Sequence, residues 1–342
     1  MPTDLPVEIA LGAVLMTGLV LYALMGGADF GGGVWDLFAS GPRKNEQRAL
    51  IADVISPIWE TNHVWLILVI VILFSGFPRA FAAISIALHV PLTLFLVGVV
   101  FRGSAFTFRA YDAHEDATQR RWGLVFSFAS IVSPVLLGMI VGAIASGRIR
   151  YEHGAVVSGF FASWLTPFSL VVGLFALALF ALLAATYLTN EASSPELAED
   201  FRRRALFAGV AVALFALLAF ALAGEGAPRV REGLTARPFT WPLHAATGVA
   251  ALAAFGALFY RRYALARVAV AAQTMFILLG WAASQYPYLV VPDLTFTGAA
   301  GSPKTQRLVL YALAGGAVVI VPSLVVLFRV FRRSKGEGGK EG

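Results

Sequence analysis

Three titratable side chains, Asp53, Glu60 and His63, stand within a largely apolar stretch, residues 51–76. On a helix, Asp53 and Glu60 are seven residues apart and lie within about 20° of each other, with His63 about 60° further round. The three side chains therefore form one stripe, and Asn62 points roughly the opposite way. Carboxylates and a histidine arranged in this way can transfer protons along the stripe.

The composition places that stripe in a membrane. Of 342 residues, 58% are hydrophobic and only 13% are charged, against a usual charged share of about 25%. Because an ionisable side chain at membrane depth is costly, we expect a functional role for Glu60. For Asp53, nearer the interface, an ion pair or a helix-end carboxylate is as good an explanation. The absence of cysteine excludes disulfides, iron–sulfur clusters, thiolate-ligated haem and c-type haem attachment.

We predict an all-α integral membrane protein with about nine transmembrane helices, arranged as two four-helix bundles plus one peripheral helix. Residues 1–331 form a single polytopic domain, and residues 332–342 form a disordered cytoplasmic tail rich in Gly and charge. The first apolar run lacks a basic flank and is expected to stay as a helix. The expected spans are 7–28, 51–75, 79–102, 122–146, 159–189, 203–224, 242–261, 264–286 and 306–331.

The distribution of basic residues predicts the orientation. Lys and Arg are concentrated in the loops that follow the first, third, fifth and seventh spans, and in the tail. The positive-inside rule then places the N-terminus outside and the C-terminus in the cytoplasm. Since these basic residues sit in short loops, they indicate topology and not nucleic-acid binding.

Two further charged residues fall near the same membrane surface. The segment GGADFGGGVWD, residues 26–36, is expected to form a turn after the first span, with Asp29 at the cytoplasmic helix end. Arg102 closes the third span within reach of Asp29 or Glu60, or else extends to the lipid headgroups. His89, near the middle of that span, is expected to be structural or a proton relay. No two histidines share one span at i, i+4, so no metal site is predicted.

Several stretches occur in an order that is specific, although each alone is weak. They are GADFGGGVWDLF at 27–38, SPIWETNHVWLI at 56–67, FPRAFAAI at 77–84, VFRGSAFTFR at 100–109, YPYLVVP at 286–292 and VIVPSLVVLF at 319–328. With them the chain resembles, nearly end to end, subunit II of the cytochrome bd-type quinol oxidases, especially the cyanide-insensitive kind.

The resemblance implies a subunit of a bacterial inner-membrane enzyme that oxidises quinol and reduces dioxygen to water. In that family, haem b and haem d (or a third haem b) are held by subunit I, so this chain has no catalytic residue of its own. It supplies scaffold and a proton route from the cytoplasm, and in some members subunit II also holds a structural quinone. Whether a small single-span subunit joins is left open, and membrane lipids surround the complex.

By the same resemblance, Glu60 matches the acid of a W-[DE]-x-N motif implicated in proton delivery, with Trp59 and Asn62 as its neighbours. Asp29 and Arg102 match an acid and a base of the family. Many members carry Asp at the Glu60 position and a further acid where Gly26 stands here. The expected proton route comprises Asp29, Asp53, Glu60 and His63, and the residues expected to be structural or close to the cofactor are Trp59, Asn62 and Arg102.

Two other interpretations remain. A proton-coupled secondary transporter could use Asp29, Glu60 and His63, and it would show inverted repeats and interrupted helices meeting at mid-membrane. A purely structural accessory subunit would differ from the oxidase subunit only in whether Glu60 conducts protons.

Overall fold

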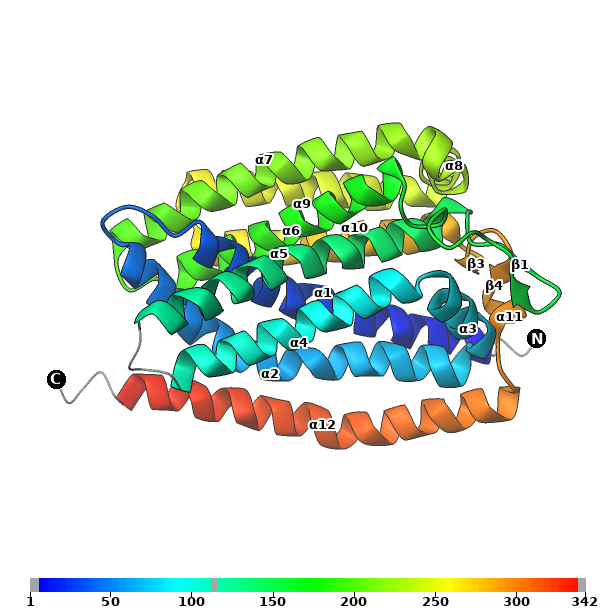
Figure 1. Ribbon diagram of the computed structural model, residues 1–342, viewed down its shortest axis with the longest axis horizontal. Coiled ribbons are helices and arrows are strands. Elements are labelled where there is room, and N and C mark those ends of the chain that lie inside the picture. The colour runs from blue at the N-terminus through cyan, green and yellow to red at the C-terminus, as the bar shows by residue number, and fades with distance from the viewer. Residues whose placement is uncertain (1–5, 112–115, 338–342) are drawn as a thin grey trace.

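The computed structural model describes the backbone of residues 6–111 and 116–337, and their side chains except at 55–61, 109–120, 321, 324–325 and 327–337. Long helices lie side by side along the long axis of the molecule, joined at its two ends by short segments (Figure 1). The predicted all-α membrane architecture is confirmed in this coarse form. The helices are α1 Val7–Leu37, α2 Lys44–Gly76, α3 Pro78–Ala87, α4 His89–Tyr111, α5 Asp116–Ser146, α6 Pro167–Glu191, α7 Pro195–Gly226, α8 Pro228–Ala236, α9 Trp241–Phe259, α10 Tyr263–Gln285, α11 Phe296–Ala299 and α12 Pro303–Glu337.

Within the described residues, seven helices are long and apolar enough to cross a membrane, or up to eight if one bent pair forms a span. The bent pair joins the end of α2, residues 62–76, to α3 through an angle of 116°. The count of nine and the two four-helix bundles stay predictions. In Figure 1, α12 lies along the outside of the other long helices, where its described side chains are mostly exposed.

The expected third span, 79–102, is wrong as a single helix. The chain forms α3 and then α4, and the two meet at Leu88, which caps α3 through a bond from its N–H to the Ile84 carbonyl. Pro78 starts α3, as proline commonly starts helices, because its missing N–H is not needed there. His89 therefore begins α4 and is exposed, where the sequence had placed it near mid-membrane.

The glycine-rich segment 26–36 is helical, and the predicted turn there is wrong. Helix α1 continues to Leu37 without a break. The glycines are needed for close packing: a Cβ at Gly27 would lie 2.6 Å from Leu183 Cδ1, and one at Gly31 would collide with the Phe180 carbonyl oxygen. Small residues let membrane helices approach closely, and that packing offsets the low helix propensity of glycine.

Helices α1, α5 and α6 form the centre of the molecule. Two-thirds of the most apolar part of α6 is buried (67%), the largest share of any described candidate span. Its N-terminus is capped by Thr166, whose hydroxyl accepts from the Ser169 N–H. This central layer holds α1 between α2 on one side and α6 on the other, and so fixes the position of Asp29.

The end of the molecule near the N-terminus carries two small antiparallel strand pairs: β1 Tyr151–Glu152 with β2 Ala155–Val156, and β3 Tyr288–Val290 with β4 Leu294–Thr295. Asp293 accepts from Arg150 Nε at 2.9 Å and from the Tyr151 N–H at 2.8 Å, which ties the two pairs together. The hydrogen bond to Asp293 raises the pKa of Arg150. At the opposite end, α12 extends to Glu337, into the predicted tail, and residues 338–342 lie outside the described part.

Candidate functional site

A buried ion pair joins α1 to α4. Arg102 Nη1 donates to Asp29 Oδ2 at 2.8 Å, and Arg102 Nη2 donates both to Asp29 Oδ1 at 2.7 Å and to the Asp29 carbonyl oxygen at 2.8 Å. Asp29 is 0% exposed and Arg102 is 2% exposed. A planar guanidinium fits a carboxylate in this two-pronged way, which makes the pair stronger and more directional than a lysine pair would be.

The remaining surface of the guanidinium is also engaged. Its Nε donates to Ser130 Oγ on α5 at 2.9 Å, and Ser130 in turn donates to the Phe126 carbonyl oxygen. The Phe30 and Phe126 rings lie on the guanidinium, with Cζ 4.9 and 4.8 Å from their centroids. Arg102 is thus held by α1, α4 and α5 together, so its position is fixed by the core of the molecule.

Helix α2 also approaches this carboxylate. The side chains of Asn62 and His63 lie close enough to Asp29 to act on its carboxylate. Asn62 is 1% exposed, and its Oδ1 atom has no hydrogen-bond partner. Its amide fills the space beside Gly26, where a Cβ would lie 2.9 Å from Asn62 Nδ2. The amide therefore occupies the space where the resemblance led us to expect a further acid.

The other members of the predicted α2 stripe are placed differently. Asp53 is exposed on the surface of the chain, on the opposite side of the helix from Asn62, as the sequence spacing requires. The side chains of Trp59 and Glu60 lie outside the described residues, so the stripe is described at Asp53 and His63 alone. The structure thus brings Asn62, His63 and Arg102 to Asp29, and it leaves Asp53 apart.

Two of the described histidines contact backbone carbonyl oxygens. His89 Nδ1 lies 2.9 Å from the Ile86 carbonyl oxygen, and His244 Nε2 lies 2.9 Å from that of Leu234. Among the described residues no group of three or more His, Asp or Glu side chains is arranged as metal ligands.

A mostly apolar cavity of about 370 Å³ lies between α1, α5, α6, α7 and α10, with α8 and α9 at its end. Tyr22, Phe180, His244 and Trp281 are among its lining residues. The indole Nε1 atom of Trp281 is buried and has no hydrogen-bond partner. Such a donor in an apolar cavity is suited to a ligand with an apolar body and a carbonyl oxygen.

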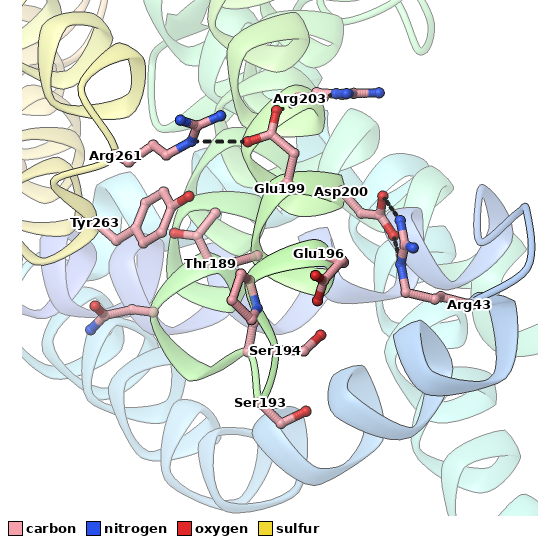
Figure 2. Close-up of a pocket in the computed structure, with 14 residues that line it drawn as sticks. Arg43, Thr189, Ser193, Ser194, Glu196, Glu199, Asp200, Arg203, Arg261 and Tyr263 are labelled. Atoms are coloured by element: carbon pink, nitrogen blue, oxygen red, sulfur yellow. Dashed lines mark hydrogen bonds and ion pairs between the residues drawn. The ribbon is translucent and has the colours of Figure 1, made fainter.

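A second, open hollow of about 850 Å³ lies at the other end, between the α6–α7 and α9–α10 connections. Figure 2 shows Arg261 pointing toward Glu199 and Arg43 pointing toward Asp200; the N–O distances are 3.4 and 2.7 Å. Arg203, also in the lining, pairs with Glu199 at 3.3 Å. Because each arginine of the lining has a carboxylate partner, the hollow is balanced in charge, and the buried pair remains the stronger functional candidate.

Sequence reasoning missed Ser130, which contacts Arg102, and the buried Tyr22 and Asp36 on α1. The signal for Ser130 was present, because Ser127, Ser130 and Ser133 recur every third residue in an expected span. Asp36 was assigned to a turn, and the error in the turn hid that it lies on the same helix face as Asp29.

Comparison with known proteins gives a consistent result. Residues 7–331 match the family model described as cytochrome bd terminal oxidase subunit II. The chain is 23% identical to the putative cytochrome bd menaquinol oxidase subunit II of Bacillus subtilis, over 96% of this chain and 98% of that protein. It is 29% identical to the cytochrome bd-I ubiquinol oxidase subunit 2 of Escherichia coli K12, over 61% of this chain and 55% of that protein.

Among solved structures, the bd oxidase from Geobacillus thermodenitrificans contains a chain with the same fold. The TM-score is 0.78 at 23% sequence identity, covering 96% of this chain and 99% of that one. The family match spans almost the whole chain and includes the α1 and α4 residues that form the buried ion pair. The chain belongs to the cytochrome bd terminal oxidase subunit II family.

Proposed function

We propose that this chain is the subunit II of a terminal oxidase that couples quinol oxidation to the reduction of dioxygen to water. Family membership over residues 7–331 carries this proposal. The chain functions in a complex with a subunit I, which holds haem b and haem d, or a third haem b. These groups supply the electron transfer and dioxygen chemistry.

We assign the face toward subunit I to α2, α4 and α12. The exposed side of α2 carries Val64, Ile67 and Phe74, and also Asp53, which is costly to leave against lipid. Helix α12 is attached at its start by the bond from Gln306 Nε2 to the Gly76 carbonyl oxygen, at 2.9 Å, and is otherwise largely exposed. A partner subunit covering this face would bury Asp53 and complete the packing of α12.

Within the complex, this chain supplies scaffold and a route for protons from the cytoplasm. The buried Asp29–Arg102 pair supports the assignment, because a fully desolvated carboxylate costs free energy that simple packing does not require. His63, Asp53 and Glu60 complete the proposed route, with Asn62 and Trp59 as structural neighbours. The Lys and Arg distribution supports a bacterial cytoplasmic membrane location with the N-terminus outside, so that α1 brings Asp29 toward the cytoplasmic side.

The apolar cavity is the place for a structural quinone, if this member of the family holds one. Its 370 Å³ volume accommodates a quinone ring or part of an isoprenoid tail, and Trp281 Nε1 offers a donor to a quinone carbonyl oxygen. That quinone would be a structural component, distinct from the quinol substrate.

The test is purification of the tagged chain from its native membrane. We expect a haem-bearing partner to co-purify, with b-type and d-type bands in the reduced-minus-oxidised spectrum and quinol-dependent oxygen consumption. Glu60→Gln should lower turnover and haem content while the complex still assembles, and Glu60→Asp should be milder. A chain that purifies without a haem protein, or a fully active Glu60→Gln complex, would contradict the respective part of the proposal. The transporter alternative has no support from the family match.

A further inference from the structure

Three arginines converge on a single carboxylate at one rim of the open hollow, near the start of α7. Glu199 on α7 pairs with Arg202 at 2.6 Å, with Arg203 at 3.3 Å and with Arg261, from the α9–α10 connection, at 3.4 Å. Three positive charges therefore meet one negative charge. Arg262, the next residue of the connection, is exposed and adds a further positive charge. Among the described residues, this basic rim lies at the end that the basic loops assign to the cytoplasm.

The other acidic side chains of the hollow lie toward the α1–α2 connection. Asp200 is held by Arg43 at 2.7 Å, and Glu196 lies close enough to Arg43 to act on it by charge. Figure 2 shows the Asp200–Arg43 pair well apart from Arg261. The lining is balanced in charge as a whole, but its charges are separated. An anion that enters the hollow is therefore attracted to the basic rim and not to the opposite side.

Arg203 and Arg261 have donors available for a ligand. Their side chains are 75% and 67% exposed. Within the described part of the chain, each donates to Glu199 through its Nε atom alone. A guanidinium carries five N–H donors, so the Nη groups of both arginines remain open to a partner. Pairs of such N–H groups match the oxygen atoms of a phosphate.

Arg203 also begins an apolar stripe on the surface of α7. Phe207, Val210 and Leu214 follow it by four, seven and eleven residues, which places them on the same face of the helix. All three are exposed, and so is Phe259 near the end of α9, just before the α9–α10 connection. A basic rim with apolar surface next to it matches a molecule that has an anionic head and apolar chains.

We propose that Arg203 and Arg261 bind the phosphate of an anionic phospholipid from the cytoplasmic leaflet, with its acyl chains along the apolar stripe of α7. Basic pockets between helices on the cytoplasmic side suit such headgroups. Figure 1 shows α7 and α9 on the side of the molecule opposite α12, so the site faces lipid when subunit I covers α2, α4 and α12. The inference goes beyond the proposed oxidase function and takes from it only the membrane orientation and the face toward subunit I.

The backbone at Arg261 offers a way to separate lipid binding from a structural role. Arg261 has a φ of 57°, in the left-handed region that glycine adopts without steric cost and other residues adopt rarely. Its exposed ion pair with Glu199 contributes little to stability. If the residue served only the turn between α9 and α10, glycine would serve better. Arg261→Gly thus removes the guanidinium while it relieves the backbone.

The experiment titrates the purified complex in detergent with phosphatidylglycerol, phosphatidylcholine or inorganic phosphate. Native mass spectrometry counts the bound lipids, and the thermal midpoint is measured on the same samples. The variants are Arg203→Gln, Arg261→Gly and the two combined. Lys44→Gln is the control, because Lys44 is an exposed cation at the same end of the molecule, on α2. We expect phosphatidylglycerol to bind about fivefold more weakly for each arginine lost and about 25-fold more weakly for both, the effect of one and two basic side chains near an anionic lipid surface.

Phosphatidylglycerol should raise the thermal midpoint of the wild type, because it binds the folded complex. Arg261→Gly should keep or raise the midpoint measured without lipid and lose part of that rise, and Lys44→Gln should match the wild type. Phosphatidylcholine should bind more weakly, and equally in all variants.

Unchanged phosphatidylglycerol binding in the double variant, or an equal loss in Lys44→Gln, would overturn the proposal. So would a midpoint without lipid that falls in both single variants, since the arginines would then be structural. Displacement of the lipid by inorganic phosphate at the same concentration would make this a site for a free anion and overturn the assignment to a lipid. No readout uses quinol or dioxygen, so a failure of the oxidase function would leave this result unaffected.

Discussion

Arg102 donates to Asp29 at the carboxylate and also at the Asp29 backbone carbonyl oxygen, at 2.7–2.8 Å in each of three bonds. The backbone contact means that the guanidinium stays attached to α1 even when the carboxylate is neutralised by a proton. An ion pair that would otherwise separate on protonation is thereby kept in place. We therefore expect the pair to hold α1 and α4 together in either charge state of Asp29.

Removing one partner of the pair should destabilise the complex strongly. Arg102→Met leaves the Asp29 carboxylate buried without a counter-ion, at a cost of about 3–5 kcal/mol in unfolding free energy. The double variant Asp29→Leu/Arg102→Met removes both charges and should recover most of that loss. The thermal midpoint of the purified complex measures both. A double variant no more stable than the single one would show that the pair contributes through its shape and not its charge.

The close approach of α1 and α6 predicts that alanine substitution affects stability very differently at two glycines, Gly31 and Gly248. At Gly31 a Cβ would collide with the Phe180 carbonyl oxygen, so Gly31→Ala must push the two backbones apart. We expect a loss of about 1–3 kcal/mol, typical of overpacking, and a lower yield of complex.

Gly248, exposed in the middle of α9, is the matched control, because a Cβ there meets nothing within 4 Å. Gly248→Ala should leave the thermal midpoint unchanged or raise it slightly, as alanine is the better helix former. Equal effects of the two substitutions would mean that the close contact at Gly31 relaxes without cost.

The sequence predicted the polar character of the site better than its geometry. Hydropathy located the long helices, because a span requires a long apolar run wherever it packs. The glycines between residues 26 and 33 suggested a turn, because their low helix propensity can be read from the local sequence. The packing against α6, which favours the helix, cannot be read from one segment. The break at Leu88 was hidden in the same way, within a continuous apolar run.

The site was predictable where it depended on helical spacing alone. Spacing correctly set Asn62 opposite Asp53, but it could not say which of the two faces the core. Arg102 was placed within reach of Asp29 from depth alone, and the structure confirms that contact. Ser130 and Asp36 required knowledge of which helices are neighbours, and this information is absent from a single sequence.

Filling the apolar cavity should remove a structural quinone if the cavity holds one. Ala219 lines the cavity from α7, and Ala219→Phe adds a ring where the ligand would lie. We expect the amount of quinone extracted from the purified Ala219→Phe complex to fall to the amount bound at the quinol substrate site alone. Ala213→Phe, exposed on the same helix, is the control and should leave the quinone content unchanged. Equal quinone content in both variants would place the quinone elsewhere.

The contact between Gly26 and Asn62 predicts that a smaller side chain at residue 62 compensates for a larger one at residue 26. The resemblance led us to expect an acid at the position of Gly26, but here a Cβ would lie 2.9 Å from Asn62 Nδ2 and 3.1 Å from Asn62 Oδ1. Gly26→Asp alone should therefore reduce the amount of assembled complex, because it displaces the amide and sets a second carboxylate near Asp29. Gly26→Asp with Asn62→Ala frees the space and should restore part of the assembly, as measured by haem recovered per membrane protein. If Gly26→Asp alone assembles like the wild type, the amide can move aside, and the size of residue 26 does not constrain how α1 and α2 pack.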